Sequence, residues 1–214
     1  MMRRPCRSQA AVPHGATACT AIATMFGVWA ADSDDVERLP FDEIVSVGAL
    51  LWKSVHDRLA EKRPFLQTEE VLQHPAIQER LGSCETTCGS LIDGATADRS
   101  YSPYYACLAA SIDKLREGNA GVFTFHEHSI GVARKGADRY YLFDSLGKSS
   151  STLVRFRSAR ELEDYVRRTY SVPSAGGDLS RAIERSRVPS ADDDALLAER
   201  VNRHAFTFVV FDIK

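Results

Sequence analysis

The sequence predicts an α+β fold in which helices come first and an antiparallel sheet follows. Residues 18–30 are almost continuously apolar, and residues 41–63 carry apolar side chains at helical spacing. Residues 121–156 then divide into short apolar and aromatic runs that turn signals separate. Since the chain has 214 residues, we expect residues 1–214 to form a single domain.

Composition limits the partners that the protein can have. A hydrophobic fraction of 44% and a charged fraction of 26% are typical of a soluble globular protein. The formal net charge is −2, so no large basic field predicts binding to nucleic acid or to an anionic membrane. No stretch approaches the roughly 18–20 apolar residues that a membrane-spanning helix needs. We expect a monomer with no nucleic-acid or membrane partner.

The five cysteines are odd in number and irregularly spaced, which does not fit a disulfide framework. They favour a reducing compartment, the cytoplasm, which would be the host cytosol for a viral or effector protein. His126, Glu127 and His128 resemble a fragment of a zinc site that Cys84 or Cys88 could complete. Because this cysteine pair has no matching second pair, we expect no metal and no cofactor.

The N-terminal half is predicted to be mainly helical. The helix over residues 18–30 is apolar on every side and should therefore be buried. A second, amphipathic helix should start near Phe41 and end near Arg63-Pro64. The other expectations are an irregular lead-in over 1–13, a short helix capped by Thr68-Glu69-Glu70, a loop-rich stretch over 74–100, and a helix from Ser102-Pro103 to Gly118-Asn119.

The C-terminal half is predicted to be mainly strands. Ser158 and Glu161 form a capping box that should open a helix ending near Tyr170. The composition of residues 171–195 is typical of a mobile loop. The expected strands are 121–125, 129–133, 139–143, 152–156 and 204–213, with a hairpin turn over 134–138 and a short helix over 195–203.

Cys19 lies at the start of the apolar helix. The amides and the dipole at a helix N-terminus favour a thiolate, which is the environment that a reactive cysteine needs. The alternative is that Cys19 is an ordinary buried small hydrophobic residue. This stretch alone does not decide between the two interpretations.

The predicted hairpin around residues 134–138 could bring together a histidine, as a base, and an aspartate that orients it. A three-residue turn at 135–137 would place His128 directly opposite Asp144, and a two-residue turn would shift this pairing by one step. Directly opposed residues have Cβ atoms about 4.5–5.5 Å apart. Asp144 could then fix the tautomer of the imidazole and leave its other nitrogen for the thiol of Cys19. With Cys19 included, this arrangement favours nucleophilic catalysis.

A cysteine at the head of a buried helix, followed far downstream by His and then Asp on neighbouring strands, resembles the papain-like cysteine proteases. Residues 17–23 (TACTAIA), 128–132 (HSIGV) and 140–147 (YYLFDSLG) are similar to the cysteine and His/Asp boxes of the herpesvirus tegument deubiquitinases. These three segments comprise 20 of the 214 residues. The resemblance implies a papain-like fold, with the catalytic cysteine at a buried helix start packed on a twisted antiparallel sheet that carries His and Asp.

The resemblance implies Cys19 as nucleophile, His128 as general base and acid, and Asp144 as the group that orients His128. The viral enzymes have a catalytic His two residues after the Asp, whereas this chain has Leu146, so the base must come from the preceding strand. An oxyanion donor is expected upstream of the cysteine. Gln9 is the only Gln or Asn there, although it could equally be a solvated residue of a flexible tail.

The two residues before His128, His126 and Glu127, are candidates for lining the substrate cleft. The function implied by the resemblance is deubiquitination, the hydrolysis of the (iso)peptide bond after the C-terminal Gly-Gly of ubiquitin through a thioester. The partner would be ubiquitin or a ubiquitin-like modifier and its conjugates. Two alternatives stay open: an effector-type protease or acyltransferase with another substrate, and an inactive papain-like domain that only binds.

Overall fold

The computed structural model describes residues 3–91, 106–125, 128–146, 150–170 and 205–214. As the sequence predicts, most helices precede most strands along the chain, and the strands form one large sheet. The strands are β1 (Arg3–Cys6), β2 (Leu81–Ser90), β3 (Ala106–Cys107), β4 (Ala120–Phe125), β5 (His128–Arg134), β6 (Tyr140–Asp144), β7 (Ser151–Phe156) and β8 (Ala205–Ile213). The α-helices are α1 (Cys19–Asp32), α2 (Phe41–Arg58), α3 (Thr68–Leu72), α4 (Pro75–Gln78), α6 (Leu108–Asp113) and α7 (Ala159–Tyr170).

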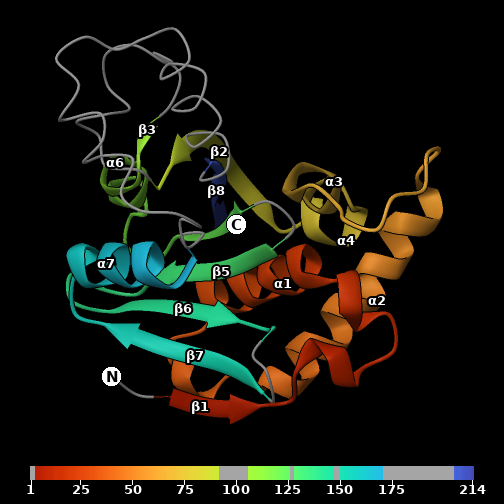
Figure 1. Ribbon diagram of the computed structural model, residues 1–214, viewed down its shortest axis with the longest axis horizontal. Coiled ribbons are helices and arrows are strands. Elements are labelled where there is room, and N and C mark those ends of the chain that lie inside the picture. Colours follow the sequence, from red (N-terminus) through yellow and green to blue (C-terminus); the bar gives the residue numbers. More distant parts are fainter. Residues whose placement is uncertain (1–2, 92–105, 126–127, 147–149, 171–204) are drawn as a thin grey trace, which may run out of the picture.

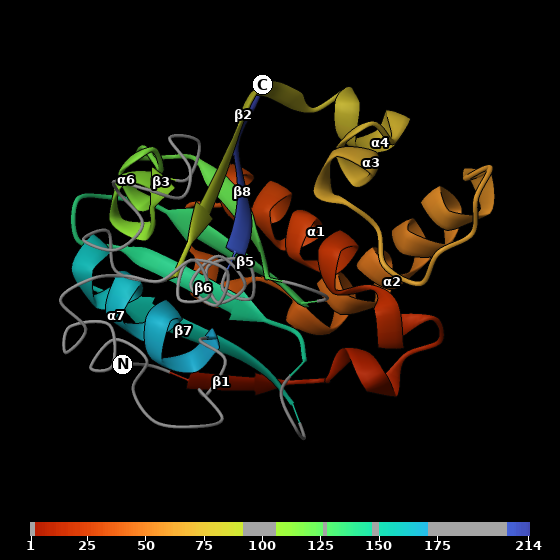
Figure 2. The same ribbon diagram turned by 45° about the horizontal axis from the view of Figure 1, so that its top comes forward.

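The strands form an eight-stranded sheet in the order β1-β7-β6-β5-β4-β8-β2-β3. Neighbouring strands are antiparallel, except that β2 and β3 run parallel. Figures 1 and 2 show α1 to α4 gathered on one side of this sheet and α6 and α7 on the other. The strand that ends the described chain, β8, lies in the interior of the sheet between β4 and β2.

Each face of the sheet builds a separate apolar core, because side chains alternate along a strand. Val122 and Val209 point to the face covered by α1 and α2. Phe123 and Phe208 point to the face covered by α6 and α7, where their rings stack with centroids 3.7 Å apart. The central strands are buried on both sides, which explains why β8 shows little polar alternation in the sequence.

Helix α1 is the centre of the first core. Nearly all its residues are buried, as the continuous apolar run predicts. It packs on β4 and β5 on one side and on α2 on the other. The contact with α2 is close at Gly48, where an added Cβ would lie 2.6 Å from the Cα of Ile22.

Several predicted elements are present. The amphipathic helix is α2, and the helix capped by Ser158 is α7, with the Ser158 hydroxyl accepting the Glu161 N–H at 3.2 Å. The short third helix begins after Gln67, whose side chain shares a capping box with Glu70. The predicted strands over 121–125, 129–133, 139–143, 152–156 and 204–213 match β4, β5, β6, β7 and β8 to within two residues.

Two expectations for the chain before residue 100 are wrong. The lead-in over 1–13 is not irregular, because β1 pairs with β7 and residues 9–11 form a 3-10 helix. The stretch over 74–100 contains α4 and the ten-residue strand β2. Since residues 82–86 of β2 are exposed on both faces, the segment shows neither polar alternation nor an apolar run.

The predicted helix over 102–118 is shorter, since α6 spans Leu108–Asp113. The start expected at Ser102-Pro103, the loop over 171–195 and the helix over 195–203 lie outside the described residues. None of the described helices is long and apolar enough to cross a bilayer.

The register between β5 and β6 also differs from the prediction. Gly131 pairs with Phe143, so the residue opposite Asp144 would be residue 130 and not His128. The turn lies one residue later than expected, because the N–H of Lys135 donates to the carbonyl of Arg139 at 2.9 Å. The resulting offset is two residues. Because side chains alternate with a period of two, His128 and Asp144 stay on the same face as diagonal neighbours.

Gly48→Ala should destabilise the fold although alanine favours helices. The gain in helix propensity is about 1 kcal/mol, but the new methyl group would meet the backbone of Ile22. Overpacking of this kind costs about 1–3 kcal/mol, so we expect a net loss in the free energy of unfolding, measured by urea denaturation. Leu50→Ala on the same helix is the control, because Leu50 is 63% exposed and should change stability by less than about 0.5 kcal/mol. Equal stability of G48A and wild type would contradict the close packing of α1 on α2.

Candidate active site

Cys19 is the first residue of α1 and is 3% exposed. A 3-10 turn over Gly15–Thr17 leads into it, and Ala18 at the N-cap provides no side-chain cap. The amides of the first helical turn are therefore not covered by a capping side chain, and their partial positive charge favours a thiolate. The position of Cys19 agrees with the sequence prediction.

His128 and Asp144 form an ion pair beside Cys19. Nε2 of His128 lies 3.2 Å from Oδ1 of Asp144, and both side chains are only about a fifth exposed, at 21% and 19%. The predicted contact is thus present, although the two residues are diagonal and not directly opposed. The other ring nitrogen, Nδ1, is buried and has no nitrogen or oxygen partner in the described part of the chain. This leaves Nδ1 for the neighbouring thiol.

The electrostatics of Cys19 and His128 are mutually reinforcing. Burial would raise the pKa of the Cys19 thiol, but the interaction with His128 and the backbone of Ser129 hold that pKa below its ordinary value. Burial likewise disfavours the charged imidazole, yet Asp144 and Cys19 raise the pKa of His128 to about 9. Between these two pKa values the pair exists as thiolate and imidazolium, which is the reactive form of a cysteine nucleophile.

Asp144 is held in its charged form by three donors. Burial would raise its pKa, but His128, the N–H of Leu146 and the hydroxyl of Tyr170 together lower it. The Leu146 N–H donates to Oδ1 at 2.9 Å, and the Tyr170 hydroxyl donates to Oδ2 at 2.8 Å. A carboxylate with both oxygens engaged cannot rotate without losing a hydrogen bond. Sequence reasoning did not identify Tyr170.

The neighbours of Cys19 and His128 connect helix and sheet by a chain of hydroxyls. The hydroxyl of Thr20 donates to the carbonyl of Leu66 at 3.0 Å, so it must accept from Ser129 at 2.9 Å. Ser129 in turn accepts from Thr124 at 2.9 Å. These contacts tie the residue after Cys19 to the residue after His128. A threonine inside an otherwise apolar helix was the sequence signal for such a contact. The partners of Thr20 could not be identified from it, because they lie far along the chain.

Gln9 is buried, at 1% exposure, so its interpretation as a solvated residue of a flexible tail is wrong. The hydroxyl of Ser145 donates to Oε1 of Gln9 at 2.5 Å, and Nε2 of Gln9 donates to the carbonyl of Ala16 at 3.4 Å. Because a carbonyl can only accept, the contact with Ala16 fixes which end of the amide is the NH2 group. Gln9 therefore presents its donors to the turn that precedes Cys19.

Other predicted site residues lie elsewhere or outside the description. His126 and Glu127 are outside the described residues. Cys84 and Cys88 are exposed on β2, which is separated from β5 by β4 and β8. Within the described ranges, no three His, Cys, Asp or Glu residues are grouped as metal ligands would be.

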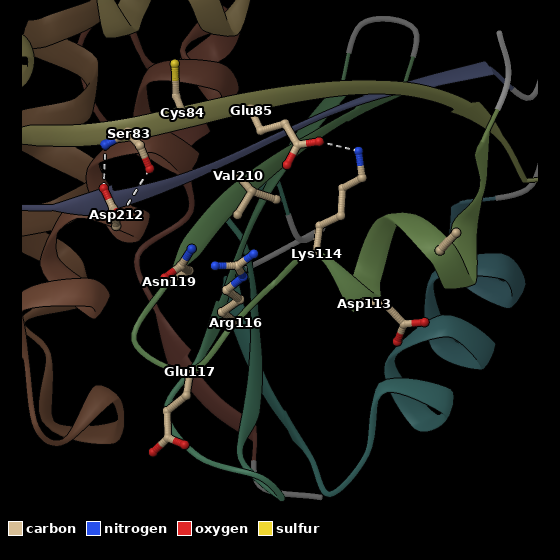
Figure 3. A pocket seen from close by; sticks show the side chains of 11 residues that line it. Ser83, Cys84, Glu85, Asp113, Lys114, Arg116, Glu117, Asn119, Val210 and Asp212 are labelled. Carbon is tan, nitrogen blue, oxygen red and sulfur yellow. Dashed lines mark hydrogen bonds and ion pairs between the residues drawn. The ribbon is translucent and has the colours of Figure 1, made fainter.

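A polar hollow of about 550 Å3 lies between β2, β8 and α6 (Figure 3). An ion pair between Lys114 and Glu85 crosses it, and the Ser83 hydroxyl donates to Asp212 at 3.1 Å on another side. The hollow is at the opposite end of the strands from Cys19, because it adjoins the start of β4 whereas His128 pairs with the end of β4. It is therefore separate from the candidate active site.

Comparison with known proteins shows a similar fold. No protein-family model matches the chain, and no curated protein matches it in sequence. Among solved structures, the chain is similar to the ubiquitin-specific protease encoded by murine cytomegalovirus tegument protein M48, crystallised with a ubiquitin-based suicide substrate. The similarity covers 100% of this chain and 87% of that chain, with a TM-score of 0.57 and 15% sequence identity. The predicted resemblance to the herpesvirus tegument enzymes is confirmed at the level of the fold.

The reactivity of Cys19 should depend on His128. In wild type, alkylation of Cys19 by iodoacetamide at pH 6 should be faster than that of an ordinary thiol, because its lowered pKa leaves more thiolate at any pH below the ordinary value. In His128→Ala the remaining effect of burial raises that pKa, so the rate at pH 6 should fall at least tenfold and recover at higher pH. The rate is read from the Cys19 peptide by mass spectrometry, with exposed Cys84 and Cys88 as internal references. His56→Ala is the control, and an unchanged rate in H128A would contradict the thiolate–imidazolium pair.

Proposed function

We propose that the protein is a cysteine protease of the deubiquitinase type, which hydrolyses the (iso)peptide bond after the C-terminal Gly-Gly of ubiquitin. The observation that carries the proposal is the position of His128 between Cys19 and Asp144, with Nε2 held at 3.2 Å by the carboxylate. The similarity in fold to a viral ubiquitin-specific protease supports the same proposal. The implied catalytic roles are those of a nucleophile, a general acid and base, and an orienting carboxylate.

The first half of the reaction forms a thioester. The Cys19 thiolate attacks the carbonyl carbon of the last glycine, and the carbonyl oxygen takes the negative charge of the tetrahedral intermediate. His128, which is protonated at neutral pH because its pKa is about 9, gives its proton to the leaving amine as the C–N bond breaks. The amine departs, and ubiquitin stays attached to Cys19 through a thioester.

The second half reverses the role of His128. The neutral imidazole takes a proton from water, the hydroxide attacks the thioester carbonyl, and the C–S bond breaks. Ubiquitin leaves as a C-terminal carboxylic acid that gives its proton to solvent, and the thiolate and imidazolium are restored. The reaction therefore requires a pH above the lowered pKa of Cys19, and it stops as the pH rises through about 9 and His128 loses its proton.

Gln9 and the backbone N–H of Cys19 are the proposed donors to the oxyanion. The amide of Gln9 is preorganised, since Ser145 holds Oε1 and the carbonyl of Ala16 holds one hydrogen of Nε2. Donors that need no rearrangement during the reaction stabilise the developing charge most effectively. Ser145 therefore acts through Gln9 as a positioning residue.

Leu146 explains why the base comes from β5 in this chain. Its side chain cannot accept a proton, and its N–H instead donates to Asp144. Since Leu146 is 47% exposed beside that carboxylate, it is available for apolar contact with a substrate.

We also propose a reducing compartment, because a thiolate nucleophile must stay unoxidised to act.

A ubiquitin probe with a C-terminal electrophile should label wild type at Cys19 and should not label Cys19→Ser. The reaction depends on the thiolate, so prior alkylation of Cys19 should block it as well. Labelling is detected as a mass shift on an intact-protein spectrum, with Cys88→Ala as the control that keeps full labelling. If iodoacetamide modifies Cys19 rapidly at pH 6 while the probe does not react, the catalytic pair acts on another substrate. If neither reagent reacts faster than with an ordinary thiol, the domain is a binding module.

Gln9→Ala should lower kcat for a ubiquitin C-terminal fluorogenic substrate by about 10²–10³, which is the usual cost of removing one oxyanion donor. The alkylation rate of Cys19 should stay within about twofold of wild type, because alkylation develops no oxyanion. Ser145→Ala leaves the amide in place but frees its orientation, so its loss in kcat should be smaller. An equal loss of alkylation and hydrolysis in Q9A would show a distorted site and contradict the oxyanion role.

A further inference from the structure

Tyr170 is the last residue of α7, on the side of the sheet away from α1. It follows the buried residues Leu162 and Val166 at intervals of four, and residues at this spacing share one face of a helix. The buried stripe that fixes α7 on the sheet therefore also directs Tyr170 toward the end of the strands. His128 and Asp144 occupy that same face and end.

The side chain of Tyr170 contacts both members of the ion pair. Its hydroxyl donates to Oδ2 of Asp144 at 2.8 Å, the oxygen that His128 does not use. Its ring stacks with those of His128 and Phe125, with centroids 5.7 Å and 5.2 Å away and interplanar angles of 29° and 4°. Phe125 and His128 are directly paired across β4 and β5, so one ring spans a cross-strand pair.

The hydroxyl of Tyr170 is a donor at every pH at which the site can work. Burial, with the nearby charge of Asp144, raises the pKa of Tyr170 well above its usual value. The phenol is therefore neutral throughout the pH range in which His128 is an imidazolium. A neutral donor stabilises the carboxylate without supplying a second cation to compete with His128.

We propose that Tyr170 is a positioning residue of the active site, which locks the carboxylate of Asp144 toward His128 and covers one face of the imidazole. This inference rests on the proposed function only for its catalytic consequence, because the ion pair between His128 and Asp144 is itself part of the structure. The Leu146 N–H holds one oxygen of Asp144 and Tyr170 holds the other, so together they fix the plane of the carboxylate. The stacked ring restricts rotation of His128 and keeps water from the contact.

The test separates the hydrogen bond from the stacking. Tyr170→Phe removes the hydroxyl and keeps the ring, whereas Tyr170→Leu removes both. Tyr165 on the same helix provides the matched control, because its ring packs on Phe156 in the second core. Tyr165→Phe should behave as wild type. The readouts are the pH dependence of Cys19 alkylation and the titration of His128 by NMR, and neither requires ubiquitin.

In Tyr170→Phe the carboxylate should turn away from His128 in part of the population. The His128 titration should move down from about 9 by about one pH unit, and the part of the Cys19 alkylation profile that depends on the imidazolium should move down with it. Tyr170→Leu should shift both quantities further. Thermal denaturation should change little in Y170F, since the ring that packs on Phe125 is retained.

Three results would overturn the proposal. A wild-type titration in Y170F would show that the hydrogen bond does not position Asp144. An upward shift of the His128 titration would show that Tyr170 only weakens the charge of a carboxylate that stays in place. A drop in thermal stability equal to that of a core substitution, without a change in either titration, would show a purely structural role. Failure of wild type with the ubiquitin probe would contradict the proposed function and would leave these readouts unaffected.

Discussion

Helix α1 is apolar on every side, so it is stable only when protein covers it all round. The sheet covers one side through β4 and β5, and α2 and α3 cover the other. The hydrophobic free energy of this burial, about 25 cal/mol for each Å2 removed from water, fixes the helix within the core. Cys19 is the first residue of that helix and is itself buried. The candidate nucleophile is thus placed by packing, before any polar contact is considered.

The candidate active site is assembled from the two faces of one sheet. Cys19 and Thr20 belong to the α1 side, whereas His128 and Asp144 point to the side of α7. They meet only because all of them lie at the same end of the strands. The hydroxyl contact between Thr20 and Ser129 is the link that holds the two sides in register at this end. Buried and fully satisfied polar networks of this kind rigidify a site more than their separate bonds suggest.

Periodicity predicted most of the helices and the central strands, because these elements bury a regular stripe or run. It failed for β2, whose first half is polar and exposed on both faces, and for β1, whose pairing with β7 depends on residues far along the chain. The register of β5 and β6 was wrong by two residues, yet the contact between His128 and Asp144 survived. A register error of one residue would have placed His128 and Asp144 on opposite faces of the sheet. The prediction of their contact therefore depended on an even register offset more than on the exact pairing.

The polar residues around the site were harder to predict than the three candidate catalytic residues. Cys19, His128 and Asp144 stand out because their residue types carry chemistry and their order along the chain is distinctive. Gln9 could be chosen only by elimination, and its burial follows from contacts with Ser145 and Ala16. Tyr170 looked like the end of an amphipathic helix, since nothing local shows that Asp144 lies within reach of its hydroxyl. Such contacts depend on the tertiary fold, which the local pattern does not contain.

The central place of β8 has a consequence for how the protein is made. During synthesis on the ribosome, Cys19 emerges early, and β4 and β5 follow before the segment that will separate β4 from β2. Until residues 205–213 are translated, one edge of β4 has no pairing strand. Val122 and Phe123 then lack their cross-strand partners Val209 and Phe208. Exposed edges of this kind invite pairing with other chains. The nascent chain is therefore most exposed to non-native strand pairing before β8 is inserted, and the sheet against which Cys19 packs is complete only after that step.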